Sequence, residues 1–280
     1  MVISLHNNDI ALIIDPQRGG GILRFDWRDQ PIFHPARMNE KGPLALANFV
    51  MVPFSNRIAN GQFLFNGEPV TLVPNYPAAS AQHPIHGHGW TEEWQIVSKT
   101  EDTLHLRYEH PCGRWPWLYV CDQIMTLVPD GYIHRVSITN IGETTMPAGL
   151  GFHPYFPRSK AKLHTSFDGF WQTSRDGLPT SWISKVGPYS LSDDDPVDTV
   201  FTGRKSPLLI EWPQHQLIIE PDFDLPETHI FAPADEDYFC IEPVSHITDA
   251  INRGGLRKLE AGETWSTQVQ FCVTEKDHLR

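Results

Sequence analysis

Apolar and polar side chains alternate with a period of two along short runs of this chain, and this pattern limits the folds open to it more than any other feature. In one run, Val136 and Ile138 alternate with Arg135 and Ser137. Such a period places every second side chain on the same face of a β-strand. No segment shows the 3.6-residue period of an amphipathic helix over about ten residues. The sequence therefore predicts an all-β protein with few short helices.

Turn residues between the runs predict how the strands connect. Asn66-Gly67 is a strong hairpin signal, because both residues tolerate positive φ. Hairpins are expected for segments 63–65 with 70–73, 94–99 with 103–109, 119–127 with 132–140, and 208–212 with 216–221. Further strands are expected at 2–5, 10–14, 22–27, 238–242 and 264–274. Segment 31–58 is expected to form a loop with short helical or extended pieces, and Asp193–Asp195 an acidic surface turn.

Residues 1–280 are expected to form a single domain. No linker or low-complexity tract divides the chain, and nine Trp and fifteen Phe residues supply material for a core. A net charge of −12 argues against a nucleic-acid partner, because phosphate backbones attract basic surfaces. No apolar run approaches the roughly 20 residues of a membrane span, so no membrane partner is expected.

The cysteines and the first residues bear on the compartment. Cys112, Cys121, Cys240 and Cys272 are scattered without a C-x-x-C pair, which is typical of reduced thiols. The first residues lack the basic and apolar regions of a secretion signal. A cytoplasmic location is therefore expected, and the chain is expected to act as a monomer or a homodimer.

Two titratable residues lie where strand-like runs end. His153 follows Gly151-Phe152 and precedes Pro154, so a bend presents its ring. Glu242 follows the apolar run 238–241, where partial burial would raise its pKa toward neutrality, as a general base requires. A histidine, whose ordinary pKa is about 6.5, suits the matching general acid. Metal-free acid–base catalysis by this pair is therefore one hypothesis.

A metal site is the competing hypothesis. His86, His88 and Glu92 have the spacing H-x-H-x-x-x-E, which resembles the first metal motif of cupins. The rest of that pattern is missing, because Ser80 stands where the motif has a glycine and no second histidine motif follows at hairpin distance.

A set of short motifs resembles the aldose 1-epimerase (mutarotase) family over about residues 10–273. The motifs are Asn56-Arg57-Ile58, Ile85-His86-Gly87, His153-Pro154-Tyr155-Phe156, Asp198-x-x-Phe201, Glu242-Pro243, Asp249-Ala-Ile-Asn252 and Leu259-Glu-Ala-Gly-Glu263. The resemblance implies a large twisted β-sandwich with the site in an open cleft on a concave sheet. It also implies an isomerase that interconverts the anomers of a small sugar without a metal or another cofactor.

By the same resemblance, Glu242 is the general base for the anomeric hydroxyl and His153 is the general acid for the ring oxygen. Ring opening, rotation about C1–C2 and closure on the other carbonyl face give the opposite anomer. The family positions that match Arg57, His86 and Asp198 hold the sugar. Further sugar contacts are expected from Asn56, His88, Trp90 and Tyr155.

The chain departs from the galactose-handling members of that family. They carry Asn where this chain has Phe152, and Gly-Gly after the loop histidine, where this chain has Gly87-His88. The His-Gly-His-Gly-Trp form at 86–90 resembles a bacterial subgroup. Two alternatives stay open: a non-catalytic sugar-binding or regulatory protein on the same fold, and a mutarotase of phosphorylated or sulfonated sugars. The second alternative needs extra cations, which Arg114, Arg158 or Arg253 would supply.

Overall fold

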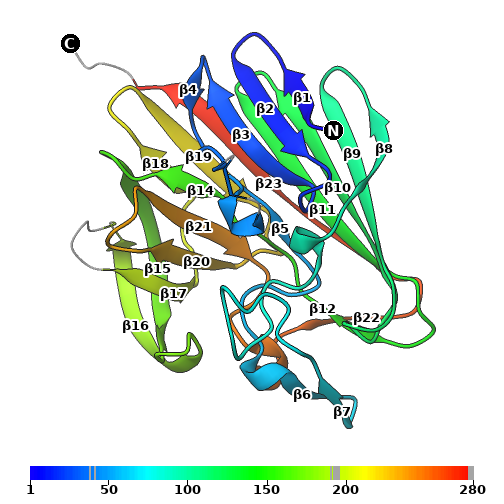
Figure 1. Ribbon diagram of the computed structural model, residues 1–280. Coiled ribbons are helices and arrows are strands. Elements are labelled where there is room, and N and C mark those ends of the chain that lie inside the picture. Colours follow the sequence, from blue (N-terminus) through cyan, green and yellow to red (C-terminus); the bar gives the residue numbers. More distant parts are fainter. Residues whose placement is uncertain (38, 41, 190, 192–195, 277–280) are drawn as a thin grey trace.

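The computed structural model describes residues 1–37, 39–40, 42–189, 191 and 196–276. The acidic turn expected at Asp193–Asp195 lies outside these residues. The described residues form twenty-three strands and four 3₁₀ helices of three or four residues (Figure 1). The all-β fold with few short helices is thereby confirmed. No helix in the described ranges has the length and apolarity needed to cross a bilayer.

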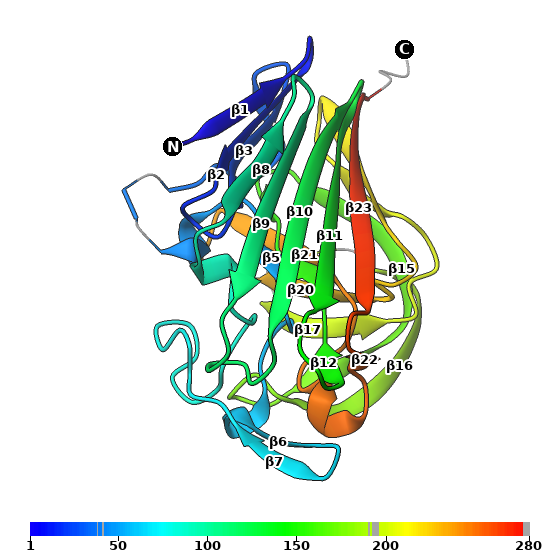
Figure 2. The ribbon, with the colours of Figure 1, turned by 90° about the vertical axis from the view of Figure 1, so that its right-hand side faces the viewer.

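Fifteen strands form one continuous hydrogen-bonded sheet that folds into two facing layers (Figures 1 and 2). The first layer contains, in spatial order, β5 (Val50–Met51), β13 (Gly151–Phe152), β21 (Tyr238–Val244), β20 (Glu227–Ala232), β17 (Val197–Thr202) and β15 (Lys162–Thr173). On this layer β14 (Tyr155–Pro157) pairs with β21, and β16 (Pro179–Tyr189) pairs with β15. The second layer contains β18 (Leu208–Glu211), β19 (His215–Pro221), β23 (Thr264–Glu275), β11 (Gly131–Asn140), β10 (Tyr119–Val128), β9 (Thr103–His110) and β8 (Gln95–Lys99). Strand β15 joins the layers, because its first residues pair with β18 and its later ones with β17.

Three smaller sheets complete the fold. A four-stranded sheet is formed by β1 (Ile3–His6), β2 (Ile10–Asp15), β3 (Gly21–Trp27) and β4 (Gln30–Pro31). Two-stranded sheets are formed by β6 (Gln62–Phe65) with β7 (Glu68–Thr71) and by β12 (Met146–Ala148) with β22 (Arg257–Leu259). The 3₁₀ helices are η1 (Pro43–Ala45), η2 (Ala59–Gly61), η3 (Gly89–Thr91) and η4 (Ala250–Arg253).

All four hairpins expected from turn residues are confirmed, as β6–β7, β8–β9, β10–β11 and β18–β19. The runs expected to be strands near both ends of the chain also form strands, with bounds that differ by one or two residues. Strands β15, β16 and β20 were not expected. Almost all of β16 is exposed, so no apolar alternation marks it in the sequence.

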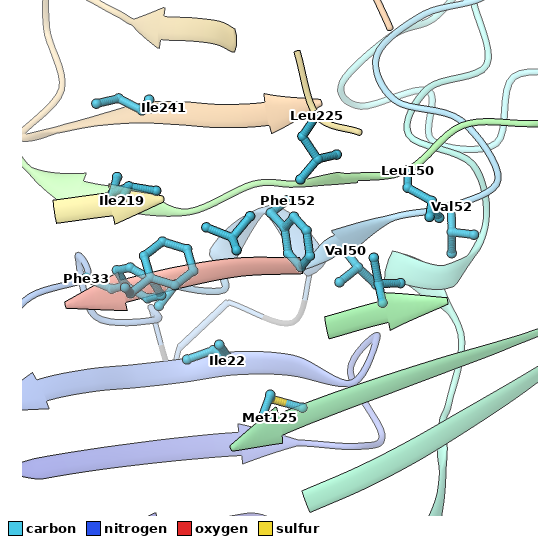
Figure 3. Packing of buried hydrophobic residues seen from close by; sticks show 14 of the residues in the cluster. Ile22, Phe33, Val50, Val52, Met125, Leu150, Phe152, Ile219, Leu225 and Ile241 are labelled. Carbon is cyan, nitrogen blue, oxygen red and sulfur yellow. The ribbon is translucent and has the colours of Figure 1, made fainter. Parts of the chain in front are cut away.

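The core lies between the layers and under the four-stranded sheet (Figure 3). Phe25 of β3 packs edge-on against Tyr132 of β11, with ring centroids 4.9 Å apart. Phe152 is fully buried in the same core, where its ring contacts His134 of β11 at 4.9 Å. Phe152, one of the two departures from the galactose-handling pattern, therefore faces the core. Such close packing fixes the strands of the first layer, which carry the candidate site.

Candidate active site

Strands β20 and β21 place two titratable side chains next to each other. Side chains alternate across a strand, so Ile230 and Ile241 enter the core while His229 and Glu242 face the other way. His229 and Glu242 are direct cross-strand partners in the antiparallel register. An imidazole and a carboxyl group thus share one face at the same level of the sheet.

His153 reaches the same place from the bend between β13 and β14. Its backbone N–H donates a hydrogen bond to the Phe49 carbonyl at 2.9 Å. Its ring lies between Phe49 and Tyr155, with ring centroids 4.5 and 4.8 Å away and nearly parallel planes. This stacking aims the His153 Nε2 at the Glu242 Oε1, and the two atoms are 3.4 Å apart.

Two loops that cross each other, one at Asn56 and one at His86, supply further polar groups. The Asn56 N–H donates to the Nδ1 of His86 at 3.1 Å, and the His86 N–H donates to the Asn56 carbonyl at 3.0 Å. Since Nδ1 accepts a hydrogen bond, the neutral ring of His86 carries its proton on Nε2. Gly87 follows with φ +68, and a Cβ there would lie 2.0 Å from the Val52 carbonyl oxygen. Only glycine lets the two loops approach this closely.

A third cluster joins β17 to β20. The Nε2 of His229 lies 2.8 Å from Oδ1 of Asp198, and its Nδ1 lies 3.3 Å from the side-chain amide of Asn56. The Asn56 amide oxygen in turn accepts a hydrogen bond from the Arg57 guanidinium at 3.2 Å. These contacts hold Asp198 and Arg57 on one side of His153 and Glu242.

The polar side chains of these clusters line one cavity of about 250 Å³. Its lining includes seven residues that the sequence had predicted, namely Asn56, Arg57, His86, His153, Tyr155, Asp198 and Glu242. A larger hollow of about 990 Å³ lies elsewhere, over β15, β18 and β19, and its lining is mostly apolar. We assign the candidate site to the smaller cavity, because that is where buried acid and base groups converge.

Burial shifts the pKa values of the central pair in opposite directions. It raises the pKa of Glu242 to about 7, against the ordinary 4.5. It lowers the pKa of His153 to about 3, with the nearby His229 acting in the same direction. The pKa of His153 falls because the buried ring loses the hydration of its charged form. In the free protein near neutral pH, His153 is neutral.

The surrounding groups are shifted as well. Burial, assisted by His153 and Arg57, lowers the pKa of His86 well below its ordinary value. Burial by itself would raise the pKa of Asp198, but the hydrogen bond and charge of His229 lower it. Burial would likewise lower the pKa of His229, but the carboxylates of Glu242 and Asp198 raise it. The contact between His229 and Asp198 thus raises the pKa of the imidazole and lowers that of the carboxyl group.

His88 and Trp90 do not line the cavity, which corrects the expectation that they contact the sugar. The ring of His88 is buried and stacks on His110, with ring centroids 5.1 Å apart. Trp90 is fully buried, and its indole N–H donates to the Gly87 carbonyl at 3.1 Å. The positive φ of both His86 and Gly87 turns the chain, so that the next side chains point into the protein.

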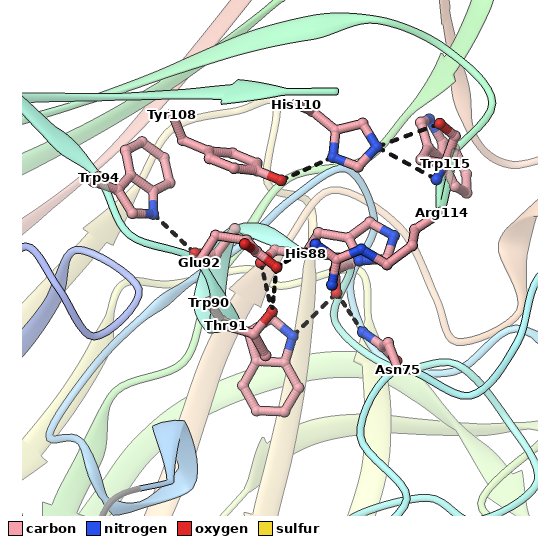
Figure 4. Close-up of polar contacts among 12 residues, drawn as sticks. Asn75, His88, Trp90, Thr91, Glu92, Trp94, Tyr108, His110, Arg114 and Trp115 are labelled. Carbon is pink, nitrogen blue, oxygen red and sulfur yellow. Dashed lines mark hydrogen bonds and ion pairs between the residues drawn. The ribbon is translucent and has the colours of Figure 1, made fainter. Parts of the chain in front are cut away.

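The metal motif proposed from His86, His88 and Glu92 is not assembled. His86 lines the cavity, whereas Glu92 forms an ion pair with Arg114 (Figure 4). A different group in the described part of the chain has ligand atoms within 4.8 Å of one another: His153, Cys240 and Glu242. Burial raises the pKa of the Cys240 thiol well above 9, so a metal bound there would have to displace its proton.

None of the three arginines considered as anion-binding cations lines the cavity. Arg114 pairs with Glu92, Arg158 donates to the Pro233 carbonyl, and Arg253 donates to the Pro179 carbonyl. Arg37 lines the cavity together with Arg57, and the Arg37 guanidinium pairs with Glu40 at 2.8 Å.

The cavity is also lined by three residues that were not predicted as site residues: His229, Phe231 and Tyr238. A signal existed for His229 and Phe231, because they alternate with apolar residues in the segment 227–232 directly before the expected strand at 238–242. Pairing those two runs as a hairpin would have placed His229 beside Glu242.

Comparisons with known proteins agree with this geometry. The profile of the aldose 1-epimerase family matches residues 1–272. The uncharacterised protein YphB of Escherichia coli K12 is 32% identical over 284 residues, which span 94% of this chain and 96% of YphB. A crystal structure of an E. coli K12 protein, proposed to be an aldose 1-epimerase, has a TM-score of 0.90 and 30% identity and covers 99% of both chains. A galactose mutarotase-like protein from Clostridium acetobutylicum has a TM-score of 0.87 over 98% of this chain and 95% of its own, and at 18% identity it shows the shared sandwich fold alone.

Proposed function

Because the chain belongs to the aldose 1-epimerase family, we propose that it interconverts the α and β anomers of a free aldose. Glu242 acts as the general base and His153 as the general acid, and the reaction uses no cofactor. The observation that carries this proposal is the contact of 3.4 Å between His153 Nε2 and Glu242 Oε1 inside a polar cavity. Two groups this close can reach the anomeric hydroxyl and the ring oxygen, which are bonded to the same carbon.

The chemistry requires that the pair hold one proton in total. For ring opening, the Glu242 carboxylate takes the proton of the anomeric hydroxyl while protonated His153 gives a proton to the ring oxygen. The C1–O5 bond breaks, and the open-chain aldehyde forms. Glu242 is then protonated and His153 neutral. Ring closure on the other face reverses both transfers and restores the starting charges.

The shifted pKa values suit this cycle. With pKa values of about 3 and about 7, the pair carries a single proton between these two pH values. In the free protein that proton resides on Glu242, which is also the arrangement needed for ring closure. The short contact between the two groups allows the proton to change sides when a cyclic sugar arrives.

The remaining groups of the cavity suit a sugar ring. The Nε2–H of His86 is a donor, Asp198 is an acceptor, and Arg57 presents a guanidinium fork. Vicinal hydroxyls donate and accept at once, so they can satisfy this mixed set. Tyr155 and Phe231 supply apolar area for the C–H groups of the ring.

The charges favour a neutral sugar over a phosphorylated or sulfonated one. Arg37 is already paired with Glu40. Arg57 lies near the carboxylates of Asp198 and Glu242, both of which respond to its charge. An anionic substituent would meet these carboxylates without an unpaired cation in the cavity lining to compensate.

Polarimetry on freshly dissolved α-glucose and α-galactose tests the proposal. Accelerated decay of the optical rotation, above the buffer rate and proportional to protein concentration, supports it. The alternative of a non-catalytic sugar-binding protein predicts heat of binding in calorimetry but the buffer rate in polarimetry. That combination would overturn the catalytic assignment.

A further inference from the structure

Three buried side chains at the cavity form a set of metal ligands, and we propose that His153, Cys240 and Glu242 together bind one Zn²⁺ ion that inhibits the protein. The ligand atoms of these residues lie within 4.8 Å of one another. The proposed reaction uses no metal, so the ion acts as an inhibitor that occupies the acid and the base. Binding of the ion is independent of the proposed function, whereas the inhibition rests on it.

The register of the first layer turns the Cys240 side chain toward the same face as Glu242. Cys240 precedes Glu242 by two residues on β21, and side chains two residues apart share a face of a strand. Its cross-strand partners are Phe231 of β20 and Tyr155 of β14, and both of these line the cavity. Cys240 itself is fully buried. The thiol therefore lies just behind the cavity lining, close to the imidazole and the carboxyl group.

The spacing of the ligand atoms is close to that of a zinc site. Zinc binds nitrogen and oxygen at about 2.0–2.1 Å in tetrahedral geometry, which places two such ligand atoms about 3.3 Å apart. The Nε2 of His153 and the Oε1 of Glu242 are 3.4 Å apart. Because no two atoms of the set are more than 4.8 Å apart, a point exists within about 2.8 Å of all three. Shifts of less than about 1 Å then bring each atom to its bond length, which is about 2.3 Å for sulfur.

The ligand set also suits zinc in chemistry and charge. Thiolate, imidazole and carboxylate are the side-chain ligands that zinc takes, and a thiolate disfavours hard ions such as Mg²⁺. The negative charges of the Cys240 thiolate and the Glu242 carboxylate balance the two positive charges of the ion, so the buried complex is neutral. On binding, the Cys240 thiol releases its proton to the solvent, as Glu242 does when it is protonated.

The cavity gives the ion a route to this set and explains why it would inhibit. His153 and Glu242 line the cavity, so an ion reaches them from there. Three protein ligands leave one position of a tetrahedral ion open, which distinguishes this set from a closed structural site. A bound ion occupies the lone pair of His153 and the carboxylate of Glu242. Neither group can then move a proton to or from a sugar.

Cobalt(II) is the spectroscopic probe for the site, because it replaces zinc and gives a near-ultraviolet charge-transfer band when a thiolate binds it. The purified protein is stripped with a chelator and titrated first with Co²⁺ and then with Zn²⁺. We expect the thiolate band to saturate at one Co²⁺ per chain and to disappear when Zn²⁺ displaces the cobalt. A titration without a thiolate band would overturn the inference.

Cysteine variants locate the ion. Cys240→Ser removes the sulfur ligand, whereas Cys112→Ser and Cys272→Ser are matched controls at an exposed and a half-buried cysteine outside the set. We expect the cobalt band to be lost in Cys240→Ser and kept in both controls. The Kd for Zn²⁺ should rise roughly 100-fold or more in Cys240→Ser, since even a partner in the outer shell of a metal is worth about 10–100-fold. A band that survives in Cys240→Ser, or is lost in either control, would contradict the inference.

Glu242→Gln tests the site without changing a cysteine, and it decides the matter if Cys240→Ser does not fold. The thiolate remains, so the cobalt band should still form. The Kd for Zn²⁺ should rise by at least about tenfold, because the amide is a poorer ligand than the carboxylate. An unchanged Kd measured by calorimetry would place the ion elsewhere and overturn the inference.

Inhibition is measured by polarimetry at sugar concentrations below KM. We expect Zn²⁺ at roughly ten times its Kd to remove about nine-tenths of the accelerated rate, EDTA to restore the rate, and Mg²⁺ to leave it unchanged. A full rate with Zn²⁺ bound to the set would overturn the inhibition. If no sugar is accelerated, the proposed function fails, and the cobalt band and the calorimetric Kd still decide whether the ion binds.

Discussion

His229 and Glu242 stand directly opposite each other on β20 and β21, and the Nε2 of His229 lies 2.8 Å from Asp198. An imidazole bonded to the carboxyl group of Asp198 thus borders the carboxyl group of Glu242. The charge of His229 lowers the pKa of Glu242, which burial alone would raise further. The charge of His229 therefore affects the pH at which Glu242 loses its proton.

Glu242→Gln is expected to lower the rate of anomer equilibration by roughly 10²–10⁴-fold, because the amide cannot accept the proton of the anomeric hydroxyl. Polarimetry measures the rate, and circular dichroism checks that the sheet content is unchanged. Glu227→Gln is the matched control, since burial also raises the pKa of Glu227 to about 7 but its side chain lies outside the cavity lining. A fully active Glu242→Gln protein would exclude Glu242 as the base.

The pH profile of kcat/KM is expected to fall about tenfold per pH unit above about 7. The pair loses its single proton as pH rises through the raised pKa of Glu242, and His153 then has no proton to give. Between about pH 5 and 6 the pair stays singly protonated, so the profile should be level after subtraction of the buffer rate. A profile that rises from pH 6 to 8 would contradict the one-proton cycle.

His229→Gln is expected to move the alkaline limb of this profile to higher pH. The variant removes the charge that lowers the pKa of Glu242, so the proton is retained longer as pH rises. The glutamine amide can still donate to Asp198, which preserves the position of that side chain. If the role of His229 is purely structural, the variant has a lower rate but the same alkaline limb in the pH profile of kcat/KM. The position of that limb therefore distinguishes an electrostatic role from a structural one.

His88→Leu is expected to leave KM within about twofold and to cost little or no stability. Among the described residues, neither buried ring nitrogen of His88 has a partner within hydrogen-bond geometry, so an apolar side chain in its place leaves no polar group buried without a hydrogen bond. Thermal unfolding and the sugar concentration dependence of the rate measure the two effects. A large rise in KM in His88→Leu would instead indicate that His88 contacts the sugar.

Glu242→Gln is also expected to stabilise the protein at alkaline pH. A raised folded pKa means that the folded state binds more protons than the unfolded state between about pH 4.5 and 7, so stability falls as pH rises through that window. The difference between about 7 and 4.5 corresponds to roughly 3 kcal/mol at most. The gain in Tm over the wild type should be larger at about pH 8 than at about pH 5, and an equal gain at both would argue against a buried ionised Glu242.

Much of the fold could be predicted because alternation and turn chemistry are local properties of a sequence. The Asn66-Gly67 turn and the alternation around Val136 gave hairpins that the structure contains. Strand β16 could not be predicted in this way, since its edge position leaves it exposed on both faces.

The candidate site was predictable only in part, for a different physical reason. His153 stands at a strand end and Glu242 two residues before the end of β21, close to where the sequence predicts that end, and the structure brings them together. His229 becomes recognisable only when the register of β20 against β21 is known. His88 and Trp90 follow His86 closely in the sequence, but the positive φ at Gly87 turns them away from the cavity.

Gly151 of β13 pairs with Met51 of β5 on one side and with Val244 of β21 on the other. During synthesis on a ribosome, β13 can therefore pair on both sides only after β21, near the end of the chain, has been made. Non-local pairings of this kind fold slowly. A nascent chain that stops before β21 lacks Glu242, the residue proposed as the base, so the proposed active site can be complete only after β21 has been translated.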